Sequence, residues 1–118
     1  MNIEAFRDYC LSLKGVEESL PFGPNTLVFK VMDKVFCICD IEQFESFNVK
    51  CSPEDVIAHQ ERFHSIHPGY HMNKKHWVTV ESNAPDVTDA FRKELLETSY
   101  ALVVKGLSRK KVEALEKL

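Results

Sequence analysis

Three runs of strand-like residues in the first half of the sequence constrain the fold more than any other feature. Residues 26–32 and 35–40 are rich in β-branched and aromatic side chains and flank Asp33-Lys34, which is typical of a tight hairpin turn. Residues 46–51 alternate apolar and polar side chains. Because the connections between these runs are too short for a crossover, the strands are predicted to pair antiparallel.

Helix signals lie on both sides of these strands. Residues 3–13 place apolar side chains at helical spacing after Asn2, which is a good N-cap residue. Residues 52–55 (Ser-Pro-Glu-Asp) form a strong helix start, because a capping serine precedes proline at the first helical position and two acids. That helix is predicted to end near residues 67–69. It is expected to bury three apolar side chains: Val56, Ile57 and Phe63.

The second half of the chain contains one more predicted strand and two more helices. Residues 76–81 are predicted to form the strand, and residues 83–86 to open a helix that Gly106 ends. That helix carries apolar side chains at helical spacing: Val87, Phe91 and Leu95. Ser108 is predicted to cap a short helix within the basic C-terminal tail, residues 105–118.

The resulting order of elements is α-β-β-β-α-β-α-α. It predicts an α+β fold of two layers, in which helices cover one face of an antiparallel sheet. The other face, if left open, is a natural binding surface. A length of 118 residues, with 44% apolar and 28% charged residues, fits a single globular domain over residues 1–118.

The same sequence disfavours several classes of protein. No apolar run is long enough to span a bilayer, so we expect no membrane contact. The N-terminal residues include acids and lack the apolar core of a signal peptide, so the expected location is the cytoplasm. Cys37 and Cys39 share one face of a predicted strand, and no C-x-x-C pair is present, so we expect reduced, structural cysteines.

Residues 67–77 concentrate the chemistry of the chain. They contain three histidines, two adjacent lysines, a tyrosine and the only tryptophan. The net charge of −3 argues against strong non-specific binding to nucleic acid. Basic residues nevertheless outnumber acidic ones in residues 50–80 and again in residues 105–118, so a local basic patch is compatible with the composition.

Five segments of the chain resemble, in order, the motifs of the MmcQ/YjbR family, and together they extend from about Glu18 to Lys110. They are Pro21-Phe22-Gly23-Pro24, Leu27-Val28-Phe29-Lys30-Val31, Lys50-Cys51-Ser52-Pro53-Glu54, residues 68–77 and residues 99–107. The resemblance implies an α+β domain similar in shape to secretion-chaperone-like and frataxin-like domains, and it implies DNA binding. One departure is Met32-Asp33, which stands where hairpins of the family often have a glycine.

Nucleic-acid binding is the leading hypothesis for function, with DNA as the partner. Lysines in residues 67–77 can neutralise phosphates, and the aromatic and histidine rings offer faces for unpaired bases. The candidate residues in this segment are Tyr70, His71, Asn73, Lys74, Lys75, His76 and Trp77. A second line of phosphate contacts is expected if the C-terminal tail folds beside them: Lys105, Arg109, Lys110 and Lys111.

Three alternatives remain open from the residues alone. A metal ion is one, held by His64, His67, His71 and His76 with Cys51, although their spacing matches no standard zinc pattern. A protein-interaction module is another, using the open sheet face and the apolar turn at residues 22–24. Catalysis is the third, through Cys51 and a histidine, but the strand pattern points Cys51 inward. We therefore expect neither an enzyme nor a cofactor.

Overall fold

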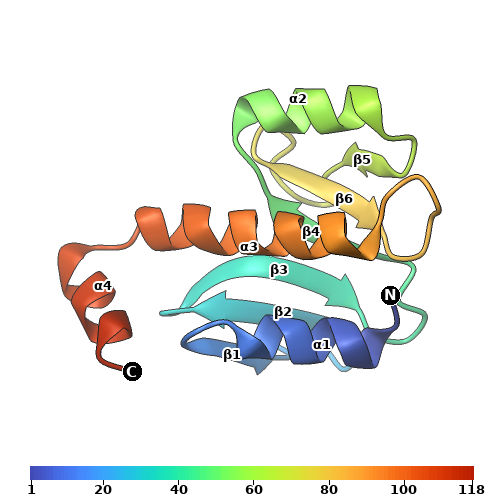
Figure 1. Cartoon of the computed structure of the whole chain (residues 1–118). Helices are drawn as coiled ribbons and strands as arrows, with labels where there is room; N and C mark the ends of the chain where they lie inside the picture. Colours follow the sequence, from blue (N-terminus) through green and yellow to red (C-terminus); the bar gives the residue numbers. More distant parts are fainter.

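The computed structural model describes residues 1–118 and contains one six-stranded antiparallel sheet in the order β1-β2-β3-β4-β6-β5 (Figure 1). The strands are β1 (Val16–Ser19), β2 (Thr26–Val31), β3 (Lys34–Asp40), β4 (Ser46–Lys50), β5 (Ile66–Pro68) and β6 (Trp77–Glu81). The helices are α1 (Ile3–Ser12), α2 (Pro53–Arg62), α3 (Asp89–Lys105) and α4 (Arg109–Glu116). The predicted α+β fold with an antiparallel sheet is confirmed, and two edge strands, β1 and β5, are additional to the prediction.

The helix starts follow one capping rule. In each helix a polar side chain accepts a hydrogen bond from the backbone N–H three residues further on, which satisfies a donor that the helix itself cannot pair. The four caps are Asn2, Ser52, Thr88 and Ser108. Three of them were predicted from the sequence, as was the end of α3 at Gly106. None of the four helices combines the length and apolar character that crossing a bilayer would need.

The predicted start of the third helix at residues 83–86 is wrong, because Thr88 is the N-cap and α3 begins at Asp89. Residues 83–86 are occupied by other contacts. The Ala84 carbonyl accepts a hydrogen bond from the Arg92 guanidinium at 2.7 Å, and the Asp86 carboxylate accepts one from the Ser65 N–H at 3.1 Å. This turn therefore connects the end of β6 to α3 before the helix can begin.

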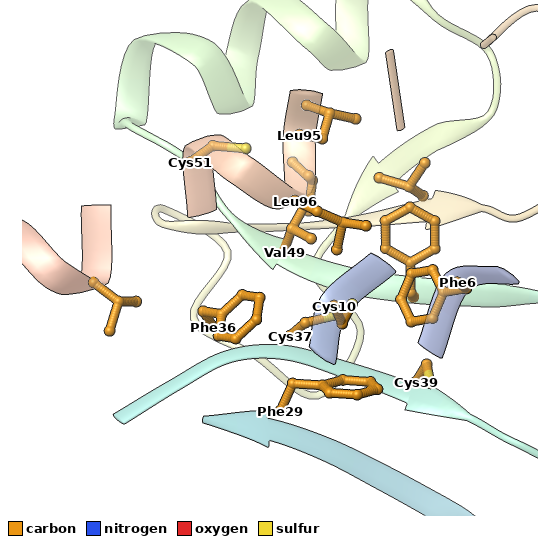
Figure 2. Packing of buried hydrophobic residues seen from close by; sticks show 14 of the residues in the cluster. Phe6, Cys10, Phe29, Phe36, Cys37, Cys39, Val49, Cys51, Leu95 and Leu96 are labelled. Carbon is orange, nitrogen blue, oxygen red and sulfur yellow. The ribbon is translucent and has the colours of Figure 1, made fainter. Parts of the chain in front are cut away.

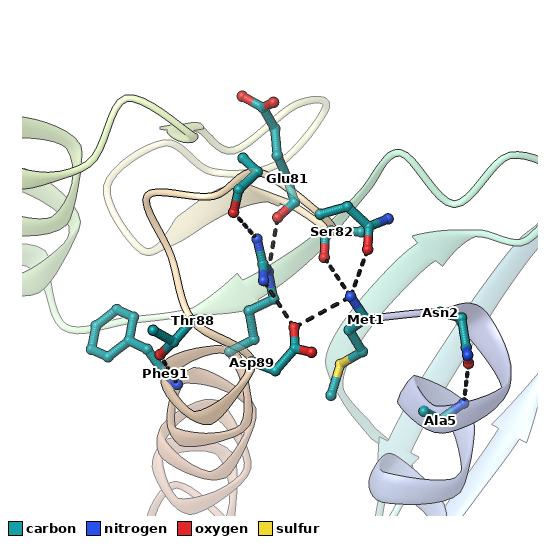
Figure 3. Close-up of polar contacts among 11 residues, drawn as sticks. Met1, Asn2, Ala5, Glu81, Ser82, Thr88, Asp89 and Phe91 are labelled. Atoms are coloured by element: carbon teal, nitrogen blue, oxygen red, sulfur yellow. Dashed lines mark hydrogen bonds and ion pairs between the residues drawn. The ribbon is translucent and has the colours of Figure 1, made fainter.

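Arg92 is the main polar connection in this region, and its partners Glu81 and Asp89 are labelled in Figure 3. Its side chain is 3% exposed, and its guanidinium donates to the Glu81 carbonyl at 3.1 Å and to the Asp89 carboxylate at 2.9 Å, in addition to Ala84. The amino group of Met1 donates to the Ser82 carbonyl at 3.2 Å and pairs with the same Asp89 carboxylate. A buried guanidinium is stable only with such partners, so these contacts fix α3 to the end of β6.

Helix α2 ends at Arg62, earlier than predicted, and its neighbour β5 occupies residues that were expected to continue it. Val56 is buried as predicted, but Ile57 is 61% exposed because only one side of α2 faces the protein. Phe63, half-buried rather than buried, packs against Phe91 of α3 with ring centroids 5.1 Å apart. Thus α2 contacts α3 through Phe63, at the C-terminal end of α2.

The hairpin between β2 and β3 turns at Met32 and Asp33, whose φ angles of 48° and 68° lie in the left-handed region. Val31 pairs directly with Lys34, so Lys34 belongs to the strand and the predicted turn is displaced by one residue. Two central residues with positive φ are typical of a type I′ turn, which twists as the flanking strands do. The turn forms here without the glycine that this position favours.

Helices α1, α2 and α3 cover one face of the sheet, and the hydrophobic core fills the space between the two layers (Figures 1 and 2). The Phe6 ring of α1 contacts three rings of the sheet side: Phe29, Phe44 and Phe47. Leu95 and Leu96 of α3 enter the same core. All four cysteines, Cys10, Cys37, Cys39 and Cys51, are free thiols buried there, and Cys37 and Cys39 share the predicted face.

A β-bulge interrupts the centre of the sheet, because Phe29 pairs with Cys37 whereas the next residue, Lys30, pairs with Val35. Phe36 is therefore the extra residue. The buried hydroxyl of Ser99, on α3, donates to the Phe36 carbonyl at 2.6 Å and accepts from the Lys50 N–H at 2.8 Å. This hydroxyl replaces a direct hydrogen bond between β3 and β4, and it fixes α3 against both strands.

Candidate functional site

The face of the sheet opposite the helices carries the side chains that alternate with the core residues. The central row across the strands contains Val28, Ile38, Asn48 and Thr79, which are linked by the strand register. Val28 is fully buried although it lies outside the helix-side core, so this face is partly covered. Two loops provide the cover: the turn between β1 and β2, and residues 69–76 between β5 and β6, called the 69–76 loop below.

Hydrogen bonds hold the start of the 69–76 loop over the sheet. The Tyr70 N–H donates to the Thr79 hydroxyl oxygen at 2.9 Å, and the same hydroxyl donates to the Asn48 side-chain oxygen. Gly69 packs directly against Trp77, where a Cβ atom would come within 2.8 Å of the Trp77 Cβ. Only glycine allows this approach without displacing the loop.

The end of the same loop is a single turn organised by Asn73. Its side-chain oxygen accepts from the Lys75 N–H at 2.9 Å, and its carbonyl accepts from the N–H groups of His76 and Trp77. The Lys74 ammonium donates to the Gly69 carbonyl at 3.2 Å. The loop is therefore internally bonded at both ends: both lysines are exposed residues of a defined turn, and the Lys74 ammonium is directed back toward Gly69.

Between the two loops and the sheet lies a groove of about 640 Å³. One wall is Phe22 of the β1–β2 turn, and the other is formed by Tyr70, His71 and Met72. The floor comes from β2, β3, β4 and β6: Thr26, Val35, Ile38, Asp40, Ser46, Asn48 and Thr79. Its volume lies within the usual range for small-ligand sites, roughly 300–1,000 Å³.

The walls of the groove expose large aromatic surface. Phe22 is 72% exposed and Tyr70 is 68% exposed, and the Tyr70 and His71 ring centroids are 4.0 Å apart. His71 has a φ of 56°, in the left-handed region that only a few per cent of residues other than glycine adopt. Exposed aromatic groups gathered at a concave site mark a candidate binding surface.

Acidic side chains line the groove and its surroundings, whereas basic side chains other than histidine do not. Asp40 is the only charged residue other than histidine that lines it, and no lysine or arginine does. A shallower hollow of about 570 Å³ adjoins it through Ser46 and Thr79, and it contains two further acids, Glu45 and Glu81, with His67 bonded to Glu81 at 2.6 Å. No lysine or arginine lines either depression, so the charged groups other than histidine that a ligand meets inside are carboxylates.

The structure brings only part of the predicted site together. Tyr70 and His71 line the groove, and Asn73, Lys74 and Lys75 are exposed on the same loop. His76 and Trp77 are half-buried where the loop joins β6, and neither lines the groove. The chemistry accessible to a ligand is therefore concentrated in residues 70–75.

The second predicted group lies on the end of α3 and on α4, which is attached elsewhere. Leu115 of α4 packs against Gly15, and the Lys111 ammonium donates to the Met32 carbonyl at 3.5 Å. Arg109, 93% exposed, pairs with Glu113, and Lys105 and Lys110 are exposed. No hydrogen bond or ion pair connects this group to the 69–76 loop, so it forms a separate basic surface.

Several residues of the groove were not among the sequence candidates. Phe22 was noted only as part of an apolar turn, and Asp40, Asn48 and Thr79 were assigned to strands without a role. Strand alternation is the signal that locates Asp40, Asn48 and Thr79, because each alternates with buried core residues of its strand. What alternation does not give is which loop folds over that face.

The metal and thiol alternatives find no support in the geometry. No group of three or more His, Cys, Asp or Glu side chains is arranged to hold a metal ion. Burial raises the pKa of the Cys51 thiol to about 12, and burial likewise raises the pKa of Cys39 to about 12. A thiol with so high a pKa is protonated at neutral pH and is a poor nucleophile.

The fold and the order of the sequence motifs define a family. Residues 11–102 match the YjbR family, and the chain belongs to it. It is 36% identical over 108 residues to the uncharacterized protein YbdF of Escherichia coli O157:H7, covering 91% of this chain and 88% of that one. It is 28% identical over 121 residues to the uncharacterized protein YjbR of Escherichia coli (strain K12), covering 100% of both chains.

Two solved structures share the fold. The crystal structure of Deinococcus radiodurans protein DR2400, a DUF419 domain, superposes with a TM-score of 0.87 at 35% identity, covering 98% of this chain and 88% of that one. A protein from Pseudomonas syringae superposes with a TM-score of 0.74 at 28% identity, covering 86% of this chain and 98% of that one. The resemblance to the family expected from the sequence is thereby confirmed.

Proposed function

We propose that this protein binds nucleic acid, with DNA as the partner, through the 69–76 loop and the groove beneath it. The observation that carries the proposal is that one internally bonded loop presents an exposed Tyr70–His71 ring pair beside two exposed lysines, Lys74 and Lys75. Binding by this surface requires neither a catalytic step nor a cofactor.

Each part of the loop suits one part of a nucleic acid. Ammonium groups neutralise phosphates and release bound counterions, which gives affinity without regard to sequence. An exposed aromatic ring stacks on an unpaired base, a contact that contributes roughly 1–3 kcal/mol where it occurs. Because these groups stand on a turn fixed by Asn73 and Thr79, little conformational entropy is lost when they meet the ligand.

The net charge of −3 sets the expected strength. A protein with few phosphate contacts and an overall negative charge binds weakly and in a strongly salt-dependent manner. We therefore expect measurable binding at low ionic strength, which weakens as salt rises.

The test is fluorescence anisotropy with labelled single-stranded and duplex DNA from about 50 mM to about 200 mM salt. Wild type is compared with Lys74→Ala/Lys75→Ala. If both lysines contact phosphates, the slope of log affinity against log salt becomes shallower by about 1.4 on single strands, at about 0.7 per phosphate.

Arg62→Ala/Lys93→Ala is the matched control, because it removes the same charge from exposed positions on α2 and α3, in the helical layer. It should leave the slope unchanged. No binding of wild type at the lowest salt, or equal slopes for the two double variants, would refute the proposal. Arg109→Ala/Lys110→Ala shows separately whether the basic surface of α4 contributes.

A second candidate function, binding of a protein segment, is favoured by one observation: Phe22 and Met72 form apolar walls of a groove that contains no lysine or arginine. An extended peptide with an apolar side chain fits such walls. That binding would tolerate salt, since apolar burial drives it, and would fall with Phe22→Ala but not with Lys74→Ala/Lys75→Ala. A pull-down at high and low salt separates the two functions.

A further inference from the structure

We propose that the groove receives one unpaired nucleobase and that the Asp40 carboxylate selects guanine. This inference rests on the proposed nucleic-acid binding and adds to it a preference for single strands and for one base. It follows from the charges of the groove, the free hydrogen-bonding groups on its floor and the position of the lysines.

The separation of charge matches the two halves of a nucleotide. The groove contains no cation, so a phosphate has no partner there and would be repelled by Asp40. A base carries no charge, and its faces suit the exposed rings of Phe22 and Tyr70 on the walls. With the base inside, the adjoining phosphates lie outside the groove, and the exposed Lys74 and Lys75, on the same loop as Tyr70, are the candidate partners for them.

The Asp40 carboxylate retains acceptor capacity toward the groove. One oxygen, Oδ1, accepts from the Glu42 N–H at 3.0 Å, and no other hydrogen bond within the protein uses this side chain. An ionised carboxylate can accept several hydrogen bonds, including two parallel ones from adjacent donors. It therefore favours a ligand edge with two donors side by side.

Guanine alone among the four bases presents such an edge, with N1–H next to the N2 amino group. Adenine and cytosine place a ring-nitrogen acceptor beside their single amino donor, and the acceptor is repelled by a carboxylate. Thymine has one N–H between two carbonyl oxygens. Charge and geometry at Asp40 thus favour guanine over the other three bases.

The neighbouring hydroxyls complete the match. Thr26, the register partner of Asp40 on β2, and Ser46 both line the groove, and neither hydroxyl makes a hydrogen bond within the protein. Each can donate to O6 of guanine, which lies beside N1–H. Asn48 is not available in the same way, because its side-chain oxygen already accepts from Thr79.

The experiment measures affinity at constant low salt for short thymine oligonucleotides that differ only in one central base. The protein variants are wild type, Asp40→Asn and Glu42→Gln. Glu42→Gln is the matched control, because it removes one negative charge at an exposed neighbour outside the groove and keeps the backbone N–H that bonds Asp40. Asp40 is itself exposed, so its substitution should leave the fold intact.

The expected result is about tenfold tighter binding of the guanine oligonucleotide than of the other three, near the low end for a good bidentate contact. Asp40→Asn abolishes this preference, and Glu42→Gln retains it. A duplex that pairs the guanine loses the advantage. If guanosine monophosphate, but not thymidine monophosphate, competes at a concentration similar to that of the oligonucleotide, the ligand is a free nucleotide. If only an oligonucleotide competes, the ligand is nucleic acid.

Four outcomes would overturn the inference. Equal affinity for all four oligonucleotides, or a guanine preference unchanged by Asp40→Asn, removes the base assignment while leaving Lys74- and Lys75-dependent binding intact. Binding of an arginine-containing peptide that depends on Asp40, with no guanine preference, makes the groove a peptide site. Absence of any oligonucleotide binding refutes the proposed function itself, which distinguishes the two failures.

Discussion

Substitution of Ser99 by alanine tests whether the β-bulge at Phe36 depends on α3. The Ser99 hydroxyl lies fully buried between two strands, where it donates to the Phe36 carbonyl at 2.6 Å and accepts from the Lys50 N–H at 2.8 Å. Ser99→Ala removes only the oxygen and keeps a residue with high helix propensity, so α3 itself should not suffer.

The expected cost follows from the two backbone groups left behind. A buried polar group without a partner costs about 1–3 kcal/mol, and here one carbonyl and one N–H lose their partner. Two effects reduce this cost. The Lys50 N–H is only partly buried, and the Ser99 hydroxyl, once removed, no longer has to be desolvated on folding. We therefore expect Ser99→Ala to lower the free energy of unfolding by about 2–3 kcal/mol.

Urea unfolding, followed by circular dichroism and by the fluorescence of Trp77, measures this cost. With an m-value of about 1.5 kcal/mol/M, a loss of about 2–3 kcal/mol lowers the midpoint by roughly 1.3–2 M. Ser12→Ala is the control: its hydroxyl also donates to a backbone carbonyl, that of Tyr9 at 2.6 Å, but it is exposed. Exposed substitutions of this kind change stability by about 0.5 kcal/mol or less.

A midpoint for Ser99→Ala within about 0.5 M of the Ser12→Ala value would refute the reasoning, because that shift corresponds to less than 1 kcal/mol. It would mean that the strands close up or that water satisfies the freed groups. An altered m-value would instead indicate that the bulge region unfolds in the native state.

Two further predictions concern the 69–76 loop and the stability of the protein at acidic pH. Gly69→Ala forces a Cβ to within 2.8 Å of the Trp77 Cβ, so it should cost about 1–3 kcal/mol and weaken oligonucleotide binding in anisotropy titrations. Gly106→Ala, whose Cβ would meet nothing closer than 3.6 Å, should leave both unchanged. The hydrogen bond from Ser65 lowers the pKa of Asp86, so its stabilisation is present above about pH 4 and is lost as pH falls through the lowered value. Unfolding midpoints between about pH 6 and pH 2.5 should therefore fall less steeply for Asp86→Asn than for wild type. Asp33→Asn, which removes a carboxylate without a hydrogen bond, should retain the wild-type slope.

The elements that the sequence predicted correctly are those with strong local signals. The helix caps at Asn2, Ser52 and Ser108 and the strands around residues 26–51 follow from capping chemistry and alternation. The edge strands were missed for a physical reason. β5 has three residues and ends in proline, and β1 has four residues with two acids, so each forms because a longer neighbour offers it a pairing edge.

Local signals also misled where tertiary contacts decided the outcome. The turn at residues 83–86 resembles a helix start, but the Arg92 guanidinium and the Ser65 N–H bond its backbone and side chains first. Ile57 repeats at helical spacing with buried residues, yet α2 lies at the edge of the protein and buries only one side. The Ser65 N–H is 21 residues from Asp86, and the bond from Arg92 to Ala84 depends on how α3 packs against β6, so no pattern within the segment reveals either contact.

The residues of the candidate loop could be predicted from the sequence, but the groove that the loop forms with the sheet could not. Tyr70, His71, Lys74 and Lys75 stood out as a group of chemically active residues, and they do lie on one loop. Their relation to the groove depends on the contact of that loop with Thr79 and on the β1–β2 turn, which brings Phe22 across from a distant segment. The partner surface was hidden in ordinary strand positions such as Asp40.

Two departures from local backbone and burial rules coincide at the groove. Four residues other than glycine have left-handed φ angles, and two of them, Met32 and Asp33, form the hairpin turn. Of the other two, Phe44 is buried in the core, whereas His71 lines the groove on the open face, at a cost of roughly 1–2 kcal/mol. The two most exposed aromatic rings of the chain, those of Phe22 and Tyr70, face the same groove. Strain and exposed aromatic surface both oppose stability, and their presence at one site is explained if that site is maintained for binding.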